Sequence, residues 1–251
     1  MHRAGSMPSE YKDTIYVKSQ ENVEDFRFDA PVVRVFQDMI ERSIPGYRLL
    51  LELIGLAANR QIGNDSIVYD LGCSLGGATL AMRRSIMAKG CKIIGVDNSV
   101  AMLERCKKII DADNSRISVE LIQEDINNIE LKSCHFVVMN FTLQFLSPSQ
   151  RLIILKKIND SLRKGGSLLV AEKISFEDEK DNETVIDWHH NFKRSQGYSD
   201  LEISQKRKAL EKVMLIDTEK FHLDRFKSAG FNKVIPFFQG LNFRAWLVIK
   251  N

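Results

Sequence analysis

The chain has 251 residues, a formal net charge of +3 and 44% hydrophobic residues, the composition of one ordinary globular domain spanning residues 1–251. The small net charge gives no reason to expect direct nucleic-acid binding, and no apolar run reaches the roughly 20 residues of a membrane span. The 4 cysteines lie far apart without a C-x-x-C pair, which argues against zinc and against disulfides. We therefore expect a protein of the reducing cytoplasm that carries no metal.

The first predicted elements are two helices in residues 30–60, after a tag-like tail at 1–13. Pro31 suits the first turn of a helix, and Pro45-Gly46 separates this helix from one that begins near Tyr47. Both helices precede the first strong strand, so we expect them to form an N-terminal cap. On local grounds Tyr47 is a core tyrosine, although its hydroxyl could also reach a ligand.

From Ser66 the pattern alternates between apolar strands and helices, which predicts a doubly wound parallel sheet covered on both faces. A charged, mostly helical insertion follows at 177–215, and a helix at 218–229 leads into a closing hairpin. Five parallel strands and an antiparallel pair make a mostly parallel, seven-stranded α/β sheet. This is the Rossmann-like layout of class I S-adenosylmethionine-dependent methyltransferases rather than of dehydrogenases. The expected strands are 66–71, 92–97, 117–123, 135–140, 167–173, 232–238 and 242–249, with helices at 77–88, 99–112 and 148–163.

The run Asp70–Gly77 closes the first strand and opens a helix, as a nucleotide-binding βαβ unit requires. Its glycines allow the backbone to approach a ligand, and the helix start offers free N–H groups. The spacing is G-x-x-x-G, because Ser74 stands where the dinucleotide fingerprint has a second glycine. This spacing disfavours NAD and favours an adenosine ligand without pyrophosphate. A plain strand–helix turn is the alternative.

Polar residues end the next strands at the same edge of the sheet, where open α/β sheets bind ligands. Asp97, followed by Asn98, is suited to accept hydrogen bonds from both hydroxyls of a ribose. Its alternative role is to cap the next helix, which Ser99 can also do. Asp125 and Ile126 lie where an adenine edge would bind, unless Asp125 is a solvated loop residue.

Asn140 ends the fourth strand within Asn140-Phe141-Thr142. Amino-group methyltransferases often have two prolines directly after this position, and this chain has none there. Catalysis on an amine is therefore not supported. A strand-end Asn that satisfies loop backbone is the alternative.

The helix predicted at 199–215 begins with the capping box Ser199-Asp200-Leu201-Glu202. At helical spacing, one face of this helix is formed by Ile203, Arg207, Leu210 and Met214. We therefore expect Arg207 on an otherwise apolar, buried face, with Lys206 and Lys208 in solvent. A buried cation requires an anionic partner, either a protein carboxylate or a ligand carboxylate held by two hydrogen bonds.

Together these residues closely resemble the bacterial carboxy-S-adenosyl-L-methionine synthases, a branch of the class I methyltransferase fold, from about Asp13 to Lys250. The insertion is the most informative part, because ordinary methyltransferases lack it. The chain departs from the family pattern in 237–245, where Arg244 stands in place of a glycine. The most specific segments are 38–47, 69–74, 140–146 and 197–207.

The resemblance implies a transferase that combines S-adenosylmethionine with prephenate to give carboxy-S-adenosylmethionine and phenylpyruvate. The implied route is an ylide that captures the carbon dioxide lost from prephenate. The resemblance also implies a homodimer, and a separate tRNA uridine carboxymethyltransferase that uses the product at the wobble position. Arg207 would be the catalytic residue that binds the new carboxylate. The implied ligand contacts are Tyr47, Gly72, Cys73, Ser74, Asp97, Asn98, Asp125, Ile126, Asn140 and Arg207.

Two other functions fit parts of the sequence. An ordinary small-molecule methyltransferase accounts for the glycine turn and Asp97 but leaves the insertion and Arg207 unexplained. A non-catalytic partner in tRNA modification that only binds S-adenosylmethionine is the second alternative. The near-neutral charge gives this alternative no support from tRNA contact.

Overall fold

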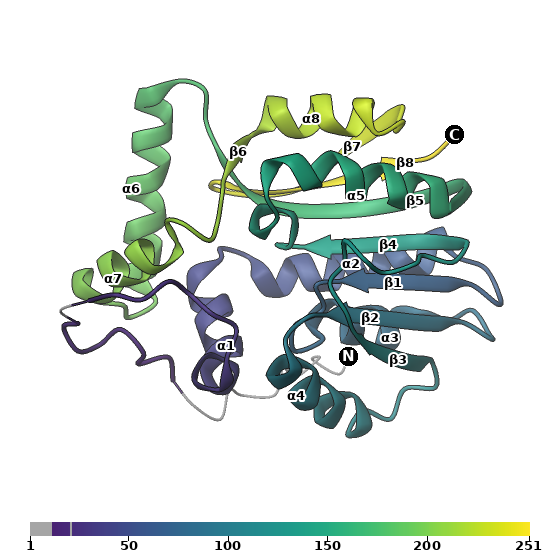
Figure 1. Ribbon diagram of the computed structural model, residues 1–251, viewed down its shortest axis with the longest axis horizontal. Helices are drawn as coiled ribbons and strands as arrows, with labels where there is room; N and C mark the ends of the chain where they lie inside the picture. Colours follow the sequence, from purple (N-terminus) through teal and green to yellow (C-terminus); the bar gives the residue numbers. More distant parts are fainter. Residues whose placement is uncertain (1–11, 21) are drawn as a thin grey trace.

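The computed structural model describes residues 12–20 and 22–251, which fold around a mixed sheet (Figure 1). Its strands are β1 (Ile67–Leu71), β2 (Lys92–Asp97), β3 (Ser118–Gln123), β4 (Cys134–Asn140), β5 (Leu162–Ser175), β6 (Asp217–Thr218), β7 (Lys233–Gly240) and β8 (Phe243–Ile249). They follow the order β3-β2-β1-β4-β5-β8-β7, and the short β6 pairs with β5. The strands β1 to β5 run parallel, whereas β8 is antiparallel to β5 and to β7. The predicted parallel sheet with an antiparallel pair is confirmed, and β6 is an addition.

Helices cover both faces of this sheet. They are α1 (Ala30–Ser43), α2 (Tyr47–Gln61), α3 (Gly77–Ser85), α4 (Val100–Asp111), α5 (Pro148–Ser161), α6 (Glu179–Ser195), α7 (Asp200–Leu210) and α8 (Glu219–Ser228). On one face Val137 packs in a cluster with side chains of α5 and α8, and on the other Val68 packs with side chains of α2 and α3. Both valines are fully buried, as expected for apolar runs in a sheet covered on both sides. Across the described ranges, no helix combines the length and apolarity needed to cross a membrane.

The two N-terminal helices pack in different parts of the fold. Pro31 lies in the first turn of α1, as predicted, and Oδ1 of Asp29 accepts a hydrogen bond from the N–H of Val32 at 3.4 Å. In α2, Leu50 and Ile54 have no exposed surface and belong to the core of one sheet face. Only α1 therefore acts as the predicted cap.

The expected tail at 1–13 lies outside the described residues except for Lys12 and Asp13, and Asp13 is not part of a tail. Its side chain is 1% exposed and accepts a hydrogen bond from the hydroxyl of Tyr198 at 2.6 Å. Its N–H donates to Oδ2 of Asp38 at 2.7 Å. These bonds fasten the start of the described chain to α1 and to the loop before α7.

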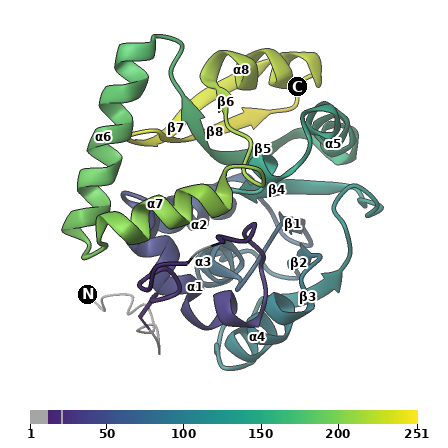
Figure 2. The same cartoon turned by 60° about the vertical axis from the view of Figure 1, so that its left-hand side comes forward.

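The insertion forms α6 and α7, which extend beyond the end of the sheet and meet α1 (Figure 2). The predicted capping box is present, because Ser199 N–H donates to Oε2 of Glu202 and Glu202 N–H donates to Oγ of Ser199. The helix ends at Leu210 rather than at 215. Leu215 N–H donates to the carbonyl of Gln144 at 2.9 Å, so the chain has already turned back to the sheet there.

Candidate active site

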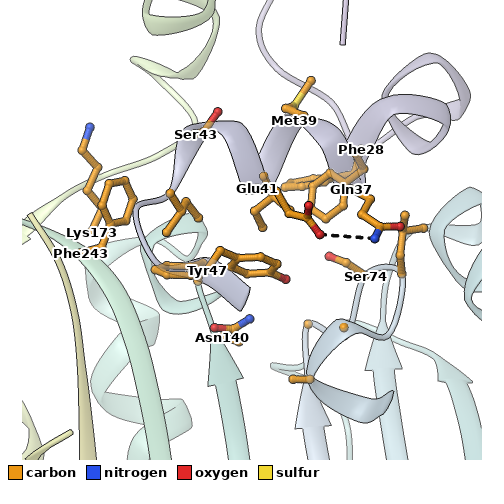
Figure 3. Close-up of a pocket in the computed structure, with 18 of the residues that line it drawn as sticks. Phe28, Gln37, Met39, Glu41, Ser43, Tyr47, Ser74, Asn140, Lys173 and Phe243 are labelled. Carbon is orange, nitrogen blue, oxygen red and sulfur yellow. Dashed lines mark hydrogen bonds between the residues drawn. The ribbon is translucent and has the colours of Figure 1, made fainter. Parts of the chain in front are cut away.

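A cavity opens at the carboxyl ends of β1 and β4, beneath α1 (Figure 3). Segments far apart in sequence line it, namely α1, the start of α2, the glycine turn, the loop after β4, and α6 and α7. Ser74 lies on one side of the cavity and Lys173 with Phe243 on the other, and Tyr47 and Asn140 lie between them. Open parallel sheets bind ligands in this position.

The glycine turn has a backbone conformation that few residue types adopt. Gly72 has a φ of +78°, and a Cβ built there would lie 2.4 Å from Oγ1 of Thr142. Ser74 is also left-handed, with a φ of +48°, and its N–H donates to Oδ2 of Asp97 at 2.9 Å. This shape brings Gly72, Cys73 and Ser74 to the cavity wall.

Asp97 organises the adjoining end of β2. Its Oδ1 accepts a hydrogen bond from the N–H of Ser99 at 2.9 Å, and Oγ of Ser99 accepts one from Met102 N–H at 3.2 Å. Ser99 therefore caps α4, so Asp97 is not needed as the cap of this helix. Burial raises the pKa of the half-buried Asp97, although the N–H groups that it accepts from oppose the shift. Asn98 beside it is exposed.

Asp125 and Ile126 follow β3, the outermost parallel strand. Oδ1 of Asp125 accepts hydrogen bonds from the backbone and side-chain nitrogens of Asn127, both at 2.8 Å, and Ile126 is buried. Of the residues predicted from the sequence, those that line the cavity are Tyr47, Gly72, Cys73, Ser74 and Asn140. Those on the neighbouring strand ends are Asp97, Asn98, Asp125 and Ile126.

Two of the residues that line the cavity have unpaired acceptor oxygens. Oδ1 of Asp70 and Oδ1 of Asn140 are buried, and neither has a hydrogen-bond partner among the described residues. Oδ2 of Asp70 accepts a bond from the hydroxyl of Thr79 at 2.6 Å, and burial raises the pKa of Asp70 to about 6. Burial, followed by the charge of Asp70, also raises the pKa of the Tyr47 phenol. Because buried acceptors are normally paired, these oxygens indicate a ligand with N–H donors. Asp70 was not predicted as a site residue from the sequence, although it is the first residue of the turn.

The loop after β4 is held from behind by Glu172. This side chain has no exposed surface and accepts hydrogen bonds from the N–H groups of Leu143 at 2.7 Å and Gln144 at 3.0 Å. Burial raises the pKa of Glu172 to about 8, and the same N–H groups oppose the shift. The loop includes Phe141 with a φ of +60°, so Glu172 fixes a strained backbone next to Asn140.

Lysines from three elements line one part of the cavity, which we call the cationic end: Lys173 of β5, Lys193 of α6 and Lys206 of α7. Burial, followed by nearby cations, lowers the pKa of Lys173 to about 8 and that of Lys193 to about 7. Burial also lowers the pKa of Lys206 to about 8, although Asp13 opposes the shift. These three lysines were not predicted from the sequence, since no spacing along the chain relates the three elements.

The expected orientation of Arg207 is wrong. Arg207 is exposed, whereas Lys206 is 6% exposed and faces inward. The inner face of α7 follows Ile203, Lys206 and Leu210, one residue out of phase with the expected arginine. Arg207 still lies close enough to the cationic end for its charge to help lower the pKa of Lys173.

His189 also lines the cavity but has a structural contact. Its Nε2 lies 2.8 Å from the carbonyl oxygen of Ser43, which links α6 to the end of α1. Burial lowers the pKa of His189, so the imidazole is neutral at physiological pH. In the part of the chain that the structure describes, no three His, Cys, Asp or Glu side chains gather as metal ligands.

Comparison with known proteins gives relatives over nearly the whole chain. A methyltransferase domain family model matches residues 68–166. A carboxy-S-adenosyl-L-methionine synthase of Photorhabdus laumondii is 50% identical over 97% of this chain and 96% of its own length. A protein of the same name from Aliivibrio fischeri is 52% identical over 95% of this chain and 98% of its own length.

Solved structures resemble the chain in fold. Human N-acetylserotonin methyltransferase in complex with SAM gives a TM-score of 0.62 at 16% identity, covering 88% of this chain and 55% of that one. A SAM-dependent methyltransferase from Aquifex aeolicus gives 0.58 at 15% identity, covering 90% and 100%. At these identities the match shows the methyltransferase fold alone.

Proposed function

The chain belongs to the carboxy-S-adenosyl-L-methionine synthase family, and from this premise we propose that it converts S-adenosylmethionine and prephenate to carboxy-S-adenosylmethionine and phenylpyruvate. The observation that carries the proposal is identity at about half of all positions over nearly the full length of both chains. The α6–α7 insertion falls within that length.

The strand ends supply the contacts for S-adenosylmethionine in this proposal. The backbone of Gly72, Cys73 and Ser74 lies against the methionine part, near the unpaired oxygens of Asp70 and Asn140 that suit its ammonium group. The next residues along the sheet edge contact the nucleoside, with Asp97 and Asn98 at the ribose and Asp125 and Ile126 at the adenine. Tyr47, which lies between the turn and the cationic end, is the proposed neighbour of the sulfonium.

The proposed reaction balances without an external oxidant or reductant. The sulfonium methyl loses a proton, and its carbon then forms a C–C bond to the carbon dioxide released from prephenate. Prephenate also loses its ring hydroxyl as hydroxide, which takes up that proton as water and leaves phenylpyruvate. The buried rings of Phe141 and Phe243 line the cavity and help to exclude bulk water from the reactive carbon.

Arg207 is the proposed contact of the new carboxylate, for which a guanidinium is well shaped. Its exposed position suits a role that involves a second copy, and we propose a homodimer. Trp188 on α6 and Leu201 on α7 are 56% and 40% exposed, and a second copy that covered them would remove apolar surface from water. We also propose that the enzyme works in the cytoplasm and supplies a separate tRNA wobble-uridine carboxymethyltransferase.

Mass spectrometry of the product tests this function. The protein is incubated with S-adenosylmethionine alone and with prephenate labelled with ¹³C in the carboxyl group bonded to its ring. We expect the label in a nucleoside product that has gained one carboxyl group, formed only when prephenate is present. S-adenosylhomocysteine as the product would indicate an ordinary methyltransferase, and unchanged S-adenosylmethionine under both conditions would indicate a binding protein.

A further inference from the structure

The cationic end is separate from the part of the cavity formed by the glycine turn. Lys173 lies beside Phe243, and Tyr47 and Asn140 stand between it and Ser74 (Figure 3). Lys193 lines the same cavity from α6. Positive charge is thus concentrated across the cavity from the turn.

The lysines of the cationic end differ in their partners. Nζ of Lys206 donates to Oγ of Ser43 at 3.0 Å and lies 3.8 Å from Oδ2 of Asp13. Within residues 12–20 and 22–251, no acidic side chain pairs with Lys173 or Lys193, and neither ammonium group has a hydrogen-bond partner. The ring of Phe243, 6.0 Å away, is a weak neighbour for Lys173.

Such an arrangement is unfavourable for the protein alone. Lys193 is 8% exposed, and both lysines have lowered pKa values because they are buried near other cations. Holding a cation near other cations without an anionic partner is costly. A ligand that brings negative charge to this end would supply the missing partners.

We propose that Lys173 and Lys193 bind the two carboxylates of the second substrate, a dicarboxylate that carries a ring. The number of unpaired cations matches such a ligand, and Phe243, whose ring is 5.8 Å from that of Phe141, provides an apolar wall for its ring. The inference rests on the proposed function, which makes prephenate this substrate. The carboxylate of S-adenosylmethionine is a weaker candidate, because Tyr47 and Asn140 separate the turn from the cationic end.

Binding measurements without turnover test the assignment. Protein loaded with S-adenosylhomocysteine, which lacks the transferable methyl, is titrated with prephenate by calorimetry. For Lys173→Met and Lys193→Met we expect prephenate affinity to fall at least about 10-fold, as for loss of one charged hydrogen bond. Affinity for S-adenosylmethionine stays within about twofold, and Tm is equal to or above that of wild type. Lys180→Met, at an exposed position of α6, is the matched control and should bind as wild type.

Each other result has a defined meaning. Unchanged prephenate affinity in both variants overturns the assignment, and so does a selective loss of S-adenosylmethionine affinity. If either variant has a lower Tm, Lys193→Arg and Lys173→Arg must retain binding, and their failure to do so overturns it too. If wild type binds no prephenate, the proposed function is at fault, and phenylmalonate replaces it as the probe. Loss of phenylmalonate binding in the variants then supports the lysine site, and unaltered or absent binding refutes it.

Discussion

Replacing Gly72 with alanine tests whether the shape of the turn makes the ligand site. The added methyl would lie 2.4 Å from Oγ1 and 2.5 Å from Cγ2 of Thr142, well inside ordinary contact distance. The left-handed backbone costs a non-glycine residue roughly 1–2 kcal/mol, and overpacking adds roughly 1–3 kcal/mol. We therefore expect the free energy of unfolding to fall by about 2–5 kcal/mol and Tm to fall by roughly 4–20 °C.

Urea denaturation measures the free energy of unfolding of the variant, and titration with S-adenosylmethionine measures its ligand affinity. Gly63→Ala is the control, because nothing lies within 4 Å of its added Cβ and its φ is not left-handed. Adding Thr142→Ala removes the two closest atoms, at the loss of the hydrogen bond to the carbonyl of Leu71. The double variant should therefore be less destabilised than the sum of the single variants. Wild-type stability of Gly72→Ala, or strict additivity with Thr142→Ala, would refute the reasoning.

Three further changes test other parts of the site. Arg207→Ala should leave S-adenosylmethionine affinity unchanged and weaken carboxy-S-adenosylmethionine binding about 10-fold by calorimetry. Lys208→Ala is the control. An equal loss of affinity for both ligands would contradict the role of Arg207. Burial raises the pKa of Asp70 to about 6, so the folded state binds its proton more tightly than the unfolded state, and stability falls as pH rises from about 4 to 6. In urea denaturation, Asp70→Asn should reduce this pH-dependent fall in the free energy of unfolding by about 3 kcal/mol. An unaltered dependence of the free energy of unfolding on pH would contradict the raised pKa of Asp70. Ser199→Ala should lower the free energy of unfolding by about 0.5–2 kcal/mol through loss of the α7 cap, whereas the exposed Ser204→Ala should not.

The sheet was predictable because its signals are local. Continuous apolar strands and intervening helices identify a parallel sheet covered on both faces, and each expected strand is present. The boundaries depend on tertiary contacts instead. The helix expected at 148–163 ends at Ser161, and β5 begins at Leu162 because that residue already pairs with Cys134.

The site was predictable only at the strand ends. Parallel strands share an edge, so residues at their carboxyl ends, such as Asp97 and Asn140, could be grouped without knowing the packing. The orientation of α7 depends on what lies against it. Lys206 faces inward because Asp13 and Ser43 contact it there, and Asp13 belongs to a segment that was expected to be a tail.

The two ends of the cavity make opposite electrostatic demands on what binds between them. Unpaired oxygens of Asp70 and Asn140 favour an ammonium group, whereas unpaired Lys173 and Lys193 favour carboxylates. A methyl acceptor without negative charge would leave both lysines uncompensated, so methyl transfer gives no reason to keep them. In the proposed site, a dicarboxylate that releases carbon dioxide would satisfy both lysines and would bring the carbon to be captured to the side of the cavity across from the glycine turn. On this proposal the methyltransferase fold supports carboxylation through cations of the insertion and of the end of β5, which transfer of a methyl group would not require.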